Sequence, residues 1–192
     1  ASNYVETGEQ KWLCNIDGTC SKHCDTCYKT CYAWKSLCFH HNVNAKAWAD
    51  NTLLLRSGKV FDMLDEELNT NPDYKNTNMF RINTSGEIEN LKQLEGWNEL
   101  ARKHPNIQFI LYTKNYEVLK QFIQKHSNSV DNFVINVSQW HHVADDFLKE
   151  NEGKFNVFEY DDSNRKNNNL LEEDIQRLFS TPHCPAVLKN GL

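Results

Sequence analysis

The chain has 192 residues, and its 26 Asp and Glu against 21 Lys and Arg give a formal net charge of -5 at pH 7. This length suits one domain with a single sizeable core. The acidic balance argues against a broad basic face for nucleic acid. No apolar run is long enough to span a bilayer, and the first residues lack the basic and apolar regions of a secretory signal. We therefore expect a cytoplasmic protein.

Segments with strand and helix patterns alternate along the chain. The predicted strands are short apolar runs at residues 11–16, 79–83, 107–112, 132–137 and 155–160. The predicted helices have apolar residues at helical spacing, at residues 31–41, 45–55, 58–68, 90–104, 116–126, 143–150 and 170–179. Ser57 is predicted to cap the helix over residues 58–68, and Asn71-Pro72 to end it.

This alternation predicts an α/β fold with right-handed crossovers and a parallel sheet covered by helices. Five strands are fewer than a closed eight-stranded barrel needs, so an open or partial (β/α) barrel is favoured. The alternative is a doubly wound sheet, but no Gly-rich phosphate loop follows any predicted strand. The sequence has no repeat of fixed period and no long linker, which predicts one domain over residues 1–192.

Six of the seven cysteines lie between residues 14 and 38. Disulfides are the least favoured explanation, because the chain has apolar strands for a core and an odd number of cysteines. Structural zinc sites usually combine two distant pairs of ligands, whereas these cysteines lie in one segment. A compact zinc knuckle of Cys20, Cys24, Cys27 and Cys31 is the zinc alternative. Closely spaced thiolates in one loop suit an iron–sulfur cluster, which is the explanation we favour.

The spacing Cys20-x3-Cys24-x2-Cys27-Tyr28 resembles the cluster loop of the radical S-adenosylmethionine (SAM) superfamily. The resemblance implies a [4Fe-4S] cluster in which three cysteines hold three irons and the fourth iron is open to SAM. It also implies a partial (β/α) barrel of the radical-SAM type with an N-terminal cysteine-rich cluster loop. The place of the run, after a predicted strand and before predicted helices, agrees with this.

A second register overlaps the first. Cys20-x6-Cys27-x3-Cys31-Tyr32-Ala33 resembles the signature of the phage-encoded gene product 88 proteins, which are associated with radical-SAM-like folds. In this register Cys20, Cys27 and Cys31 are the implied ligands, and Cys24 is a bystander or an extra ligand. The sequence does not choose between the registers, but Cys20 and Cys27 belong to both. The resemblance implies a bacterial or phage-infected cytoplasm.

Ligands in parallel βα folds lie at the carboxyl ends of the strands. Ser85-Gly86-Glu87 follows the second predicted strand and resembles the Gly-Gly-Glu motif that binds the SAM amino group. It also resembles a strand-end Ser-Gly-Asp/Glu of the phage family. Ser85 departs from the first glycine of the radical-SAM motif, and no proline follows Glu87. The alternative is a turn in which Ser85 or Glu87 caps the next helix.

Two further strand ends carry polar residues. Thr113-Lys114 also resembles the phage family, and Lys114 is a candidate contact for a carboxylate or phosphate. The favoured alternative is that Thr113 or Asn115 caps the following helix. Asn136 and Ser138 fall on one face of the fourth predicted strand, because side chains alternate along a strand. We expect these two residues to line a ligand cavity.

The last segment, residues 181–192, contains Cys184, the only cysteine outside the run. Its Cys184-Pro185 pair resembles the phage family, in which further cysteines are expected just beyond. We therefore expect a chain that is naturally short or truncated. Cys184 is either a further metal ligand or a buried thiol.

Three functions follow from these patterns. The first is an iron–sulfur enzyme that cleaves SAM reductively and acts on an unknown substrate with an electron donor. The second is a non-catalytic iron–sulfur protein in which Cys31 or Cys184 closes the open corner, and the surplus of cysteines favours this version. The third is a zinc-stabilised binding module. We expect neither nucleic acid nor a membrane as a partner.

Overall fold

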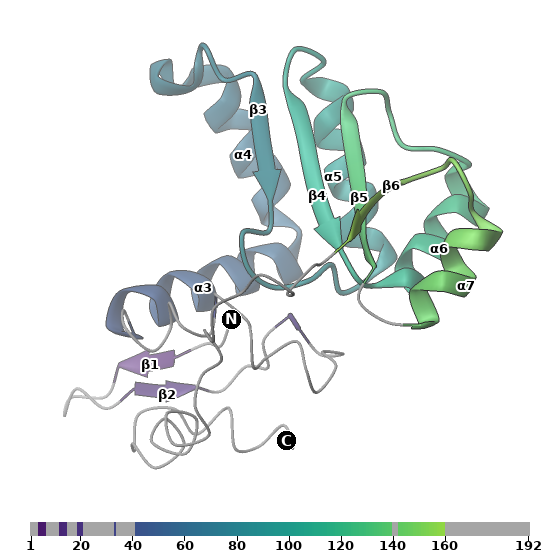
Figure 1. Cartoon of the computed structure of the whole chain (residues 1–192). Helices are drawn as coiled ribbons and strands as arrows, with labels where there is room; N and C mark the ends of the chain where they lie inside the picture. The colour runs from purple at the N-terminus through teal and green to yellow at the C-terminus, as the bar shows by residue number, and fades with distance from the viewer. Residues whose placement is uncertain are drawn as a thin grey trace, which may run out of the picture. The chain divides into compact units, whose positions relative to one another are not determined.

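The computed structural model describes residues 4–6, 12–14, 19–20, 33, 41–139 and 142–159, and Figure 1 shows them as coloured ribbon. The chain divides into two compact units, residues 1–54 with 163–192, and residues 55–162. In the first unit, β1 (Tyr4–Glu6) pairs antiparallel with β2 (Trp12–Cys14). The strand predicted over residues 11–16 therefore exists in shortened form. Its partner β1 was not predicted, and β2 is not part of the parallel sheet.

The second unit contains a four-stranded parallel sheet in the order β3-β4-β5-β6. The strands are β3 (Met79–Ile82), β4 (Gln108–Thr113), β5 (Phe133–Gln139) and β6 (Asn156–Glu159). The helices of this unit are α4 (Lys59–Thr70), α5 (Leu91–Lys103), α6 (Tyr116–His126) and α7 (His142–Glu150). Helix α3 (His41–Ser57) lies mostly in the first unit. The predicted mixed α/β fold with a parallel sheet is confirmed, with four described parallel strands in place of five.

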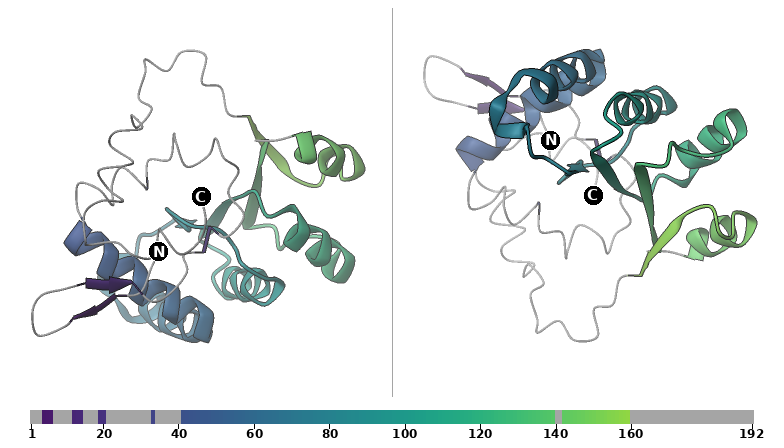
Figure 2. Two further views of the ribbon diagram at one scale, coloured as in Figure 1. Left: turned by 90° about the horizontal axis from the view of Figure 1, so that it is seen from below. Right: turned by 90° about the horizontal axis from the view of Figure 1, so that it is seen from above.

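The order of these strands follows their order in the chain. Right-handed crossovers between consecutive parallel strands place their helices on the same side of a sheet. Figure 2 shows α4, α5, α6 and α7 along one side of the sheet. A doubly wound sheet reverses its strand order at a switch point, and the described strands contain no such reversal. The described sheet is therefore singly wound.

The junction between α3 and α4 differs from the prediction. Ser57 is the last residue of α3, and Gly58 occupies the N-cap position of α4 with a φ of 78°. The predicted Ser57 cap is therefore wrong, because a left-handed residue that favours glycine separates the two helices. The Ser57 hydroxyl still accepts a hydrogen bond from the Lys59 N–H at 3.3 Å. Helix α4 ends at Asn71, as predicted, and a short 3-10 helix, η1 (Pro72–Tyr74), follows.

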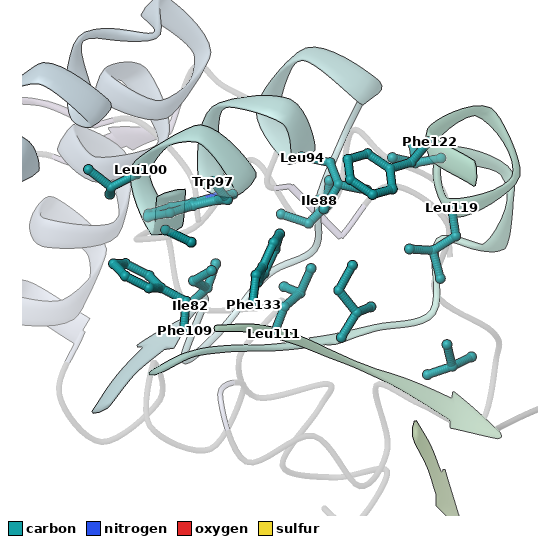
Figure 3. Packing of buried hydrophobic residues seen from close by; sticks show 14 of the residues in the cluster. Ile82, Ile88, Leu94, Trp97, Leu100, Phe109, Leu111, Leu119, Phe122 and Phe133 are labelled. Atoms are coloured by element: carbon teal, nitrogen blue, oxygen red, sulfur yellow. The ribbon is translucent and has the colours of Figure 1, made fainter. Parts of the chain in front are cut away.

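The helix-covered face of the sheet carries the apolar core. Its buried strand residues alternate along the chain and pack against the apolar sides of the helices, as Figure 3 shows. These residues are Ile82, Phe109, Leu111, Phe133, Ile135 and Val137 from the strands, with Leu94, Trp97, Leu100, Leu119, Phe122 and Phe147 from the helices. Full burial of one large apolar side chain contributes about 1.5–3 kcal/mol. This cluster is therefore the main source of stability in the second unit.

The other face of the sheet is different in composition. Strand register places on it the alternate residues Met79, Arg81, Gln108, Ile110, Tyr112, Val134, Asn136, Ser138, Asn156 and Phe158. We call this set the helix-free face, because the helices of the second unit pack on the opposite side. Parallel sheets usually bury apolar residues on both faces. Here the second face mixes amides, one guanidinium and aromatic rings, and several of its side chains are exposed.

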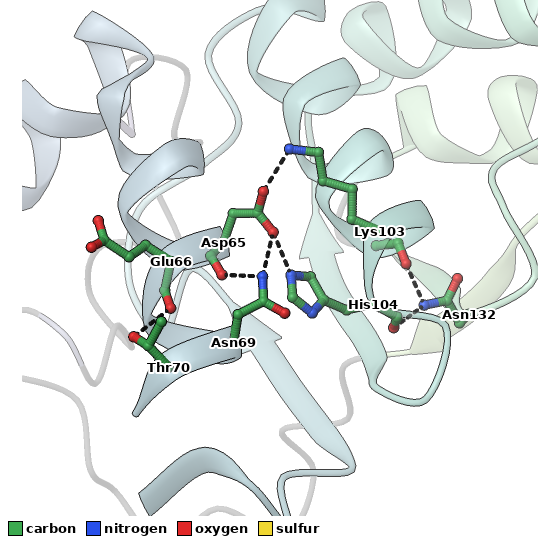
Figure 4. A network of polar contacts seen from close by, with 8 residues as sticks. Asp65, Glu66, Asn69, Thr70, Lys103, His104 and Asn132 are labelled. Atoms are coloured by element: carbon green, nitrogen blue, oxygen red, sulfur yellow. Dashed lines mark hydrogen bonds and ion pairs between the residues drawn. The ribbon is translucent and has the colours of Figure 1, made fainter. Parts of the chain in front are cut away.

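A polar cluster holds α4 against the end of α5 (Figure 4). The Asp65 carboxylate accepts a hydrogen bond from the Lys103 ammonium at 2.6 Å and lies 2.8 Å from Nε2 of the buried His104. The hydrogen bond from Lys103 lowers the pKa of Asp65 below its ordinary value. A lowered carboxyl pKa stabilises the fold above the unfolded pKa, and this stabilisation is lost as pH falls through the folded value.

The side chain of Asn132 binds backbone carbonyl groups at the same end of α5. Its Nδ2 donates to the carbonyl oxygens of Ala101, His104 and Ile107 at 2.8, 3.0 and 2.8 Å. An Asn132→Ala variant should lose about 1–3 kcal/mol of unfolding free energy, because three partly buried carbonyl oxygens would each lose one hydrogen bond. The exposed Asn128 provides the matched control, and Asn128→Ala should change the value by about 0.5 kcal/mol or less. Urea denaturation compares the two variants, and equal effects would contradict this assignment.

Candidate functional site at the carboxyl ends of the strands

The loop after β3 turns through two left-handed residues, Asn83 with φ 50° and Gly86 with φ 91°. Gly86 has a direct reason to be glycine, because side chains disfavour this backbone region. The following helix α5 is capped by Asn90, whose side chain accepts a hydrogen bond from the Gln93 N–H at 3.0 Å. The alternative in which Ser85 or Glu87 caps that helix is therefore wrong.

Glu87 instead binds the loop after the neighbouring strand β4. Its Oε2 accepts hydrogen bonds from the Thr113 hydroxyl at 2.7 Å and from the Lys114 N–H at 2.9 Å. Asn115 joins the same two loops, since its Nδ2 donates to the Ile88 carbonyl oxygen at 2.7 Å. Two strand-end motifs that were identified separately in the sequence therefore meet through one carboxylate.

The electrostatics of Glu87 are unusual for a glutamate. Burial raises the pKa of Glu87 above its ordinary value, and the hydrogen bonds from Thr113 and Lys114 only partly offset this effect. Thr113 itself is 1% exposed, so the hydroxyl that contacts the carboxylate is shielded from water. A carboxyl group with a perturbed pKa at the end of a parallel strand is a candidate functional group.

Asn115 confirms the predicted cap of α6. Its Oδ1 accepts a hydrogen bond from the Val118 N–H at 3.4 Å. Its own N–H donates to the Thr113 hydroxyl oxygen at 3.0 Å. The Lys114 N–H donates to the Glu87 carboxylate, and the predicted contact of Lys114 with a ligand carboxylate or phosphate stays a prediction. The Thr113–Asn115 turn thus both starts a helix and holds a carboxylate.

The end of β5 lies next to this turn in the sheet. Asn136 and Ser138 share the helix-free face, as their spacing predicted. Asn136 Nδ2 donates to the Leu111 carbonyl oxygen at 3.3 Å, and the Ser138 carbonyl oxygen accepts from the Tyr116 hydroxyl at 2.7 Å. These contacts connect the ends of β4 and β5. A ligand cavity lined by Asn136 and Ser138 stays a prediction.

An ion pair that the sequence did not reveal fixes the loop after β3. The Arg56 guanidinium contacts both oxygens of Glu89, with Nη2–Oε1 and Nε–Oε2 distances of 2.6 and 3.0 Å. Burial alone would raise the pKa of Glu89, but hydrogen bonds from Arg56 and Gln93 lower it overall. Arg56 lies in the last turn of α3, so the pair connects that turn to the loop carrying Ser85-Gly86-Glu87. A separation of 33 residues leaves no local pattern from which to predict it.

The cysteine positions are described only in part. Cys20 is exposed, and Cys14 is the last residue of β2. The other predicted ligands, Cys24, Cys27, Cys31 and Cys184, lie outside the described residues. Within the described ranges, no group of three or more His, Cys, Asp or Glu side chains could hold a metal ion. No helix in that part of the chain is long and apolar enough to cross a membrane.

Comparison with known families gives one match. The sequence model of the family described as Gene product 88 matches residues 6–191 of this chain. Comparisons with curated proteins and with solved structures found no match. The matched range contains the cysteine run, the four parallel strands and Cys184. The family similarity therefore covers every candidate site residue considered above.

Glu87 and Glu89 provide a matched pair for testing the electrostatics of this site. A raised carboxyl pKa contributes stability below the unfolded pKa, and this contribution is lost as pH rises through the folded value. Glu87→Gln keeps an acceptor oxygen for Thr113 and removes the charge. The unfolding free energy of Glu87→Gln relative to wild type should therefore increase as pH rises above the ordinary glutamate pKa.

Glu89→Gln should show the opposite slope, but at lower pH, because the pKa of Glu89 is lowered and the stability that its charged form contributes is lost as pH falls below the ordinary glutamate value. Urea denaturation at several pH values measures both slopes. A flat or negative slope for Glu87→Gln would contradict the burial of its carboxyl group.

Proposed function

Because the chain belongs to the gene product 88 family, we propose that it is an iron–sulfur protein in which residues 14–38 hold a [4Fe-4S] cluster. The observation that carries this proposal is the spacing of Cys20, Cys24, Cys27 and Cys31 in one short run. Thiolates are soft ligands suited to iron–sulfur clusters, and short spacings let one loop reach several irons. The donor set therefore fits the group that the family resemblance implies.

The ligands are assigned from the overlap of the two registers. Cys20 and Cys27 belong to both, so they are the two assigned ligands, and either Cys24 or Cys31 supplies the third. The exposed position of Cys20 suits a residue at an accessible metal site. Cys184 is a candidate for a further ligand. Zinc bound by the same four cysteines of the run is the alternative that metal analysis separates from this assignment.

The finer fold that we propose is a partial (β/α) barrel of the radical-SAM type. Three observations support it. The described strands are singly wound, their helices lie on one side, and the other face carries polar and aromatic residues. A barrel requires the first two features, because its strands run in sequential order and its helices form an outer ring. Polar residues on the other face would suit an inner surface that binds a ligand. Residues 1–192 would form this single domain.

We further propose that Ser85, Gly86 and Glu87 contact the amino group of SAM, with Asn136 and Ser138 on the neighbouring face as additional contacts. The support is the Glu87 carboxylate, which the Thr113 hydroxyl and the Lys114 N–H hold in a fixed position. A primary ammonium group complements this carboxylate and would favour its charged form. When bound and reduced, a cluster of this class supplies the electron for reductive cleavage of SAM.

A second candidate function is a closed, non-catalytic cluster. The observation that favours it is the number of cysteines, because seven are present and an open cluster needs three. Cys31 or Cys184 would then occupy the remaining corner, and the role would be redox, regulatory or structural. A zinc-stabilised binding module is the third candidate. We place each version in the cytoplasm of a bacterium or a phage-infected cell, with an electron donor or an unknown substrate as partner.

The ligand assignment predicts the metal content of cysteine variants. Cys20→Ala and Cys27→Ala should each lose most of their iron and acid-labile sulfide, because both registers require these thiolates. Of Cys24→Ala and Cys31→Ala, the variant that loses iron identifies the correct register. Ser21→Ala, within the same run, is the control and should retain the wild-type content.

Iron, sulfide and zinc are measured on anaerobically purified protein. Full retention of iron in Cys20→Ala or Cys27→Ala would overturn both registers. Stoichiometric zinc without sulfide would replace the cluster by the zinc alternative.

A further inference from the structure

The helix-free face contains a row of interacting side chains that the proposed function does not use. Tyr112 lies near the middle of this row. The Arg81 guanidinium lies over the Tyr112 ring, 5.3 Å from the ring centroid. On its other side, Phe158 meets Tyr112 edge to face, with ring centroids 5.5 Å apart and an angle of 83° between the planes. The three residues come from β3, β4 and β6. The row therefore crosses the whole described sheet.

Two members of this row are accessible. Phe158 is 46% exposed, and Arg81 is also exposed. No hydrogen bond or ion pair to Arg81 occurs within the described part of the chain, although the protein is acidic overall. Contact with the Tyr112 ring orients the guanidinium, while its N–H groups stay available for an anion. Exposed aromatic and arginine side chains are the types that dominate binding sites.

The amides beside this row add hydrogen-bonding capacity. Asn136 and Asn156 are register partners on the same face, next to Tyr112. The Asn136 side chain donates to the Leu111 carbonyl oxygen, and no described residue donates to its Oδ1. Asn156 is exposed. An asparagine amide presents a donor and an acceptor side by side, which is the pattern that matches the edge of a nucleobase.

The charge of the face selects among ligands. Arg81 is the only charged residue among those that strand register places there. This positive face differs from the strand-end site, where the Glu87 carboxylate suits an ammonium group. An anion is therefore favoured beside Arg81 on this face.

From these contacts we propose that the helix-free face binds a mononucleotide. Its base lies against Phe158 and Tyr112, the Asn136 and Asn156 amides contact the base edge, and Arg81 contacts the phosphate. Strands β3 and β5 are two strand spacings apart, roughly 10 Å, which one nucleotide can span. Stacking of a base on an aromatic side chain contributes about 1–3 kcal/mol. This inference rests on the proposed function: the substrate of the proposed enzyme is then a nucleotide.

The test measures binding of AMP, UMP, adenosine and SAM to the full-length protein by isothermal titration calorimetry. At least one of the two nucleotides should bind wild type. Phe158→Leu should lower the affinity for that nucleotide by about 5-fold to 150-fold, the range that corresponds to the stacking contribution. Arg81→Gln should lower the affinity for the nucleotide but not the affinity for adenosine, because only the nucleotide carries the phosphate.

Val157→Ala is the matched control. Val157 lies on the same strand, is 48% exposed and belongs to the opposite face, so this variant should bind the nucleotide with wild-type affinity. Phe158→Tyr should keep most of the affinity, which separates loss of stacking from loss of fold. Absence of nucleotide binding at millimolar concentration would overturn the proposal. Equal weakening by Val157→Ala and Phe158→Leu would also overturn it.

The same titration separates this inference from the proposed function. Glu87→Gln should weaken the binding of SAM and leave the nucleotide affinity unchanged, because Glu87 belongs to the proposed SAM site alone. Metal analysis is made on the same samples. A zinc-containing protein that binds the nucleotide would contradict the iron–sulfur proposal and support the nucleotide site. An iron–sulfur protein without nucleotide affinity would support the iron–sulfur proposal and contradict the nucleotide site.

Discussion

The site depends on one carboxylate that joins two strand ends. Glu87 accepts hydrogen bonds from the Thr113 hydroxyl and the Lys114 N–H, and this fixes the loop after β3 against the loop after β4. Burial raises the pKa of Glu87, so its charged form destabilises the fold. Natural proteins often keep such groups where function requires them. The strand end is therefore both the point where hydrogen bonds join the loops after β3 and β4 and the place that we propose for ligand binding.

The singly wound sheet gives its two faces different roles. The helix-covered face contains the large apolar residues and supplies most of the stability of the second unit. The other face combines Arg81, Tyr112 and Phe158 in a row beside two amides. The Glu87 carboxylate at the strand end is complementary to a cationic group of a ligand, and the Arg81 guanidinium on this face is complementary to an anionic group. On this account Glu87 contacts SAM and Arg81 contacts an anionic substrate, while Asn136 is a candidate contact for either ligand.

Local patterns predicted most elements of the second unit. Helical periodicity located α5, α6 and α7, and apolar runs located β3 to β6, in each case to within about two residues of the observed ends. Cysteine spacing indicated the family that the sequence model then matched. The failures have a common physical origin, because Gly58 depends on one backbone angle and Arg56–Glu89 on residues far apart in sequence. The sequence also put Glu87 and Thr113 at neighbouring strand ends without revealing that they bond.

Electron paramagnetic resonance of the reduced protein, recorded with and without SAM, tests the central claim most directly. The account predicts the signal of a reduced [4Fe-4S] cluster that changes shape when SAM is added, because SAM would bind an iron that no cysteine holds. A cluster signal that SAM leaves unchanged would contradict the open site and favour the closed, non-catalytic cluster. Absence of any cluster signal from protein that contains stoichiometric zinc would contradict the iron–sulfur assignment itself.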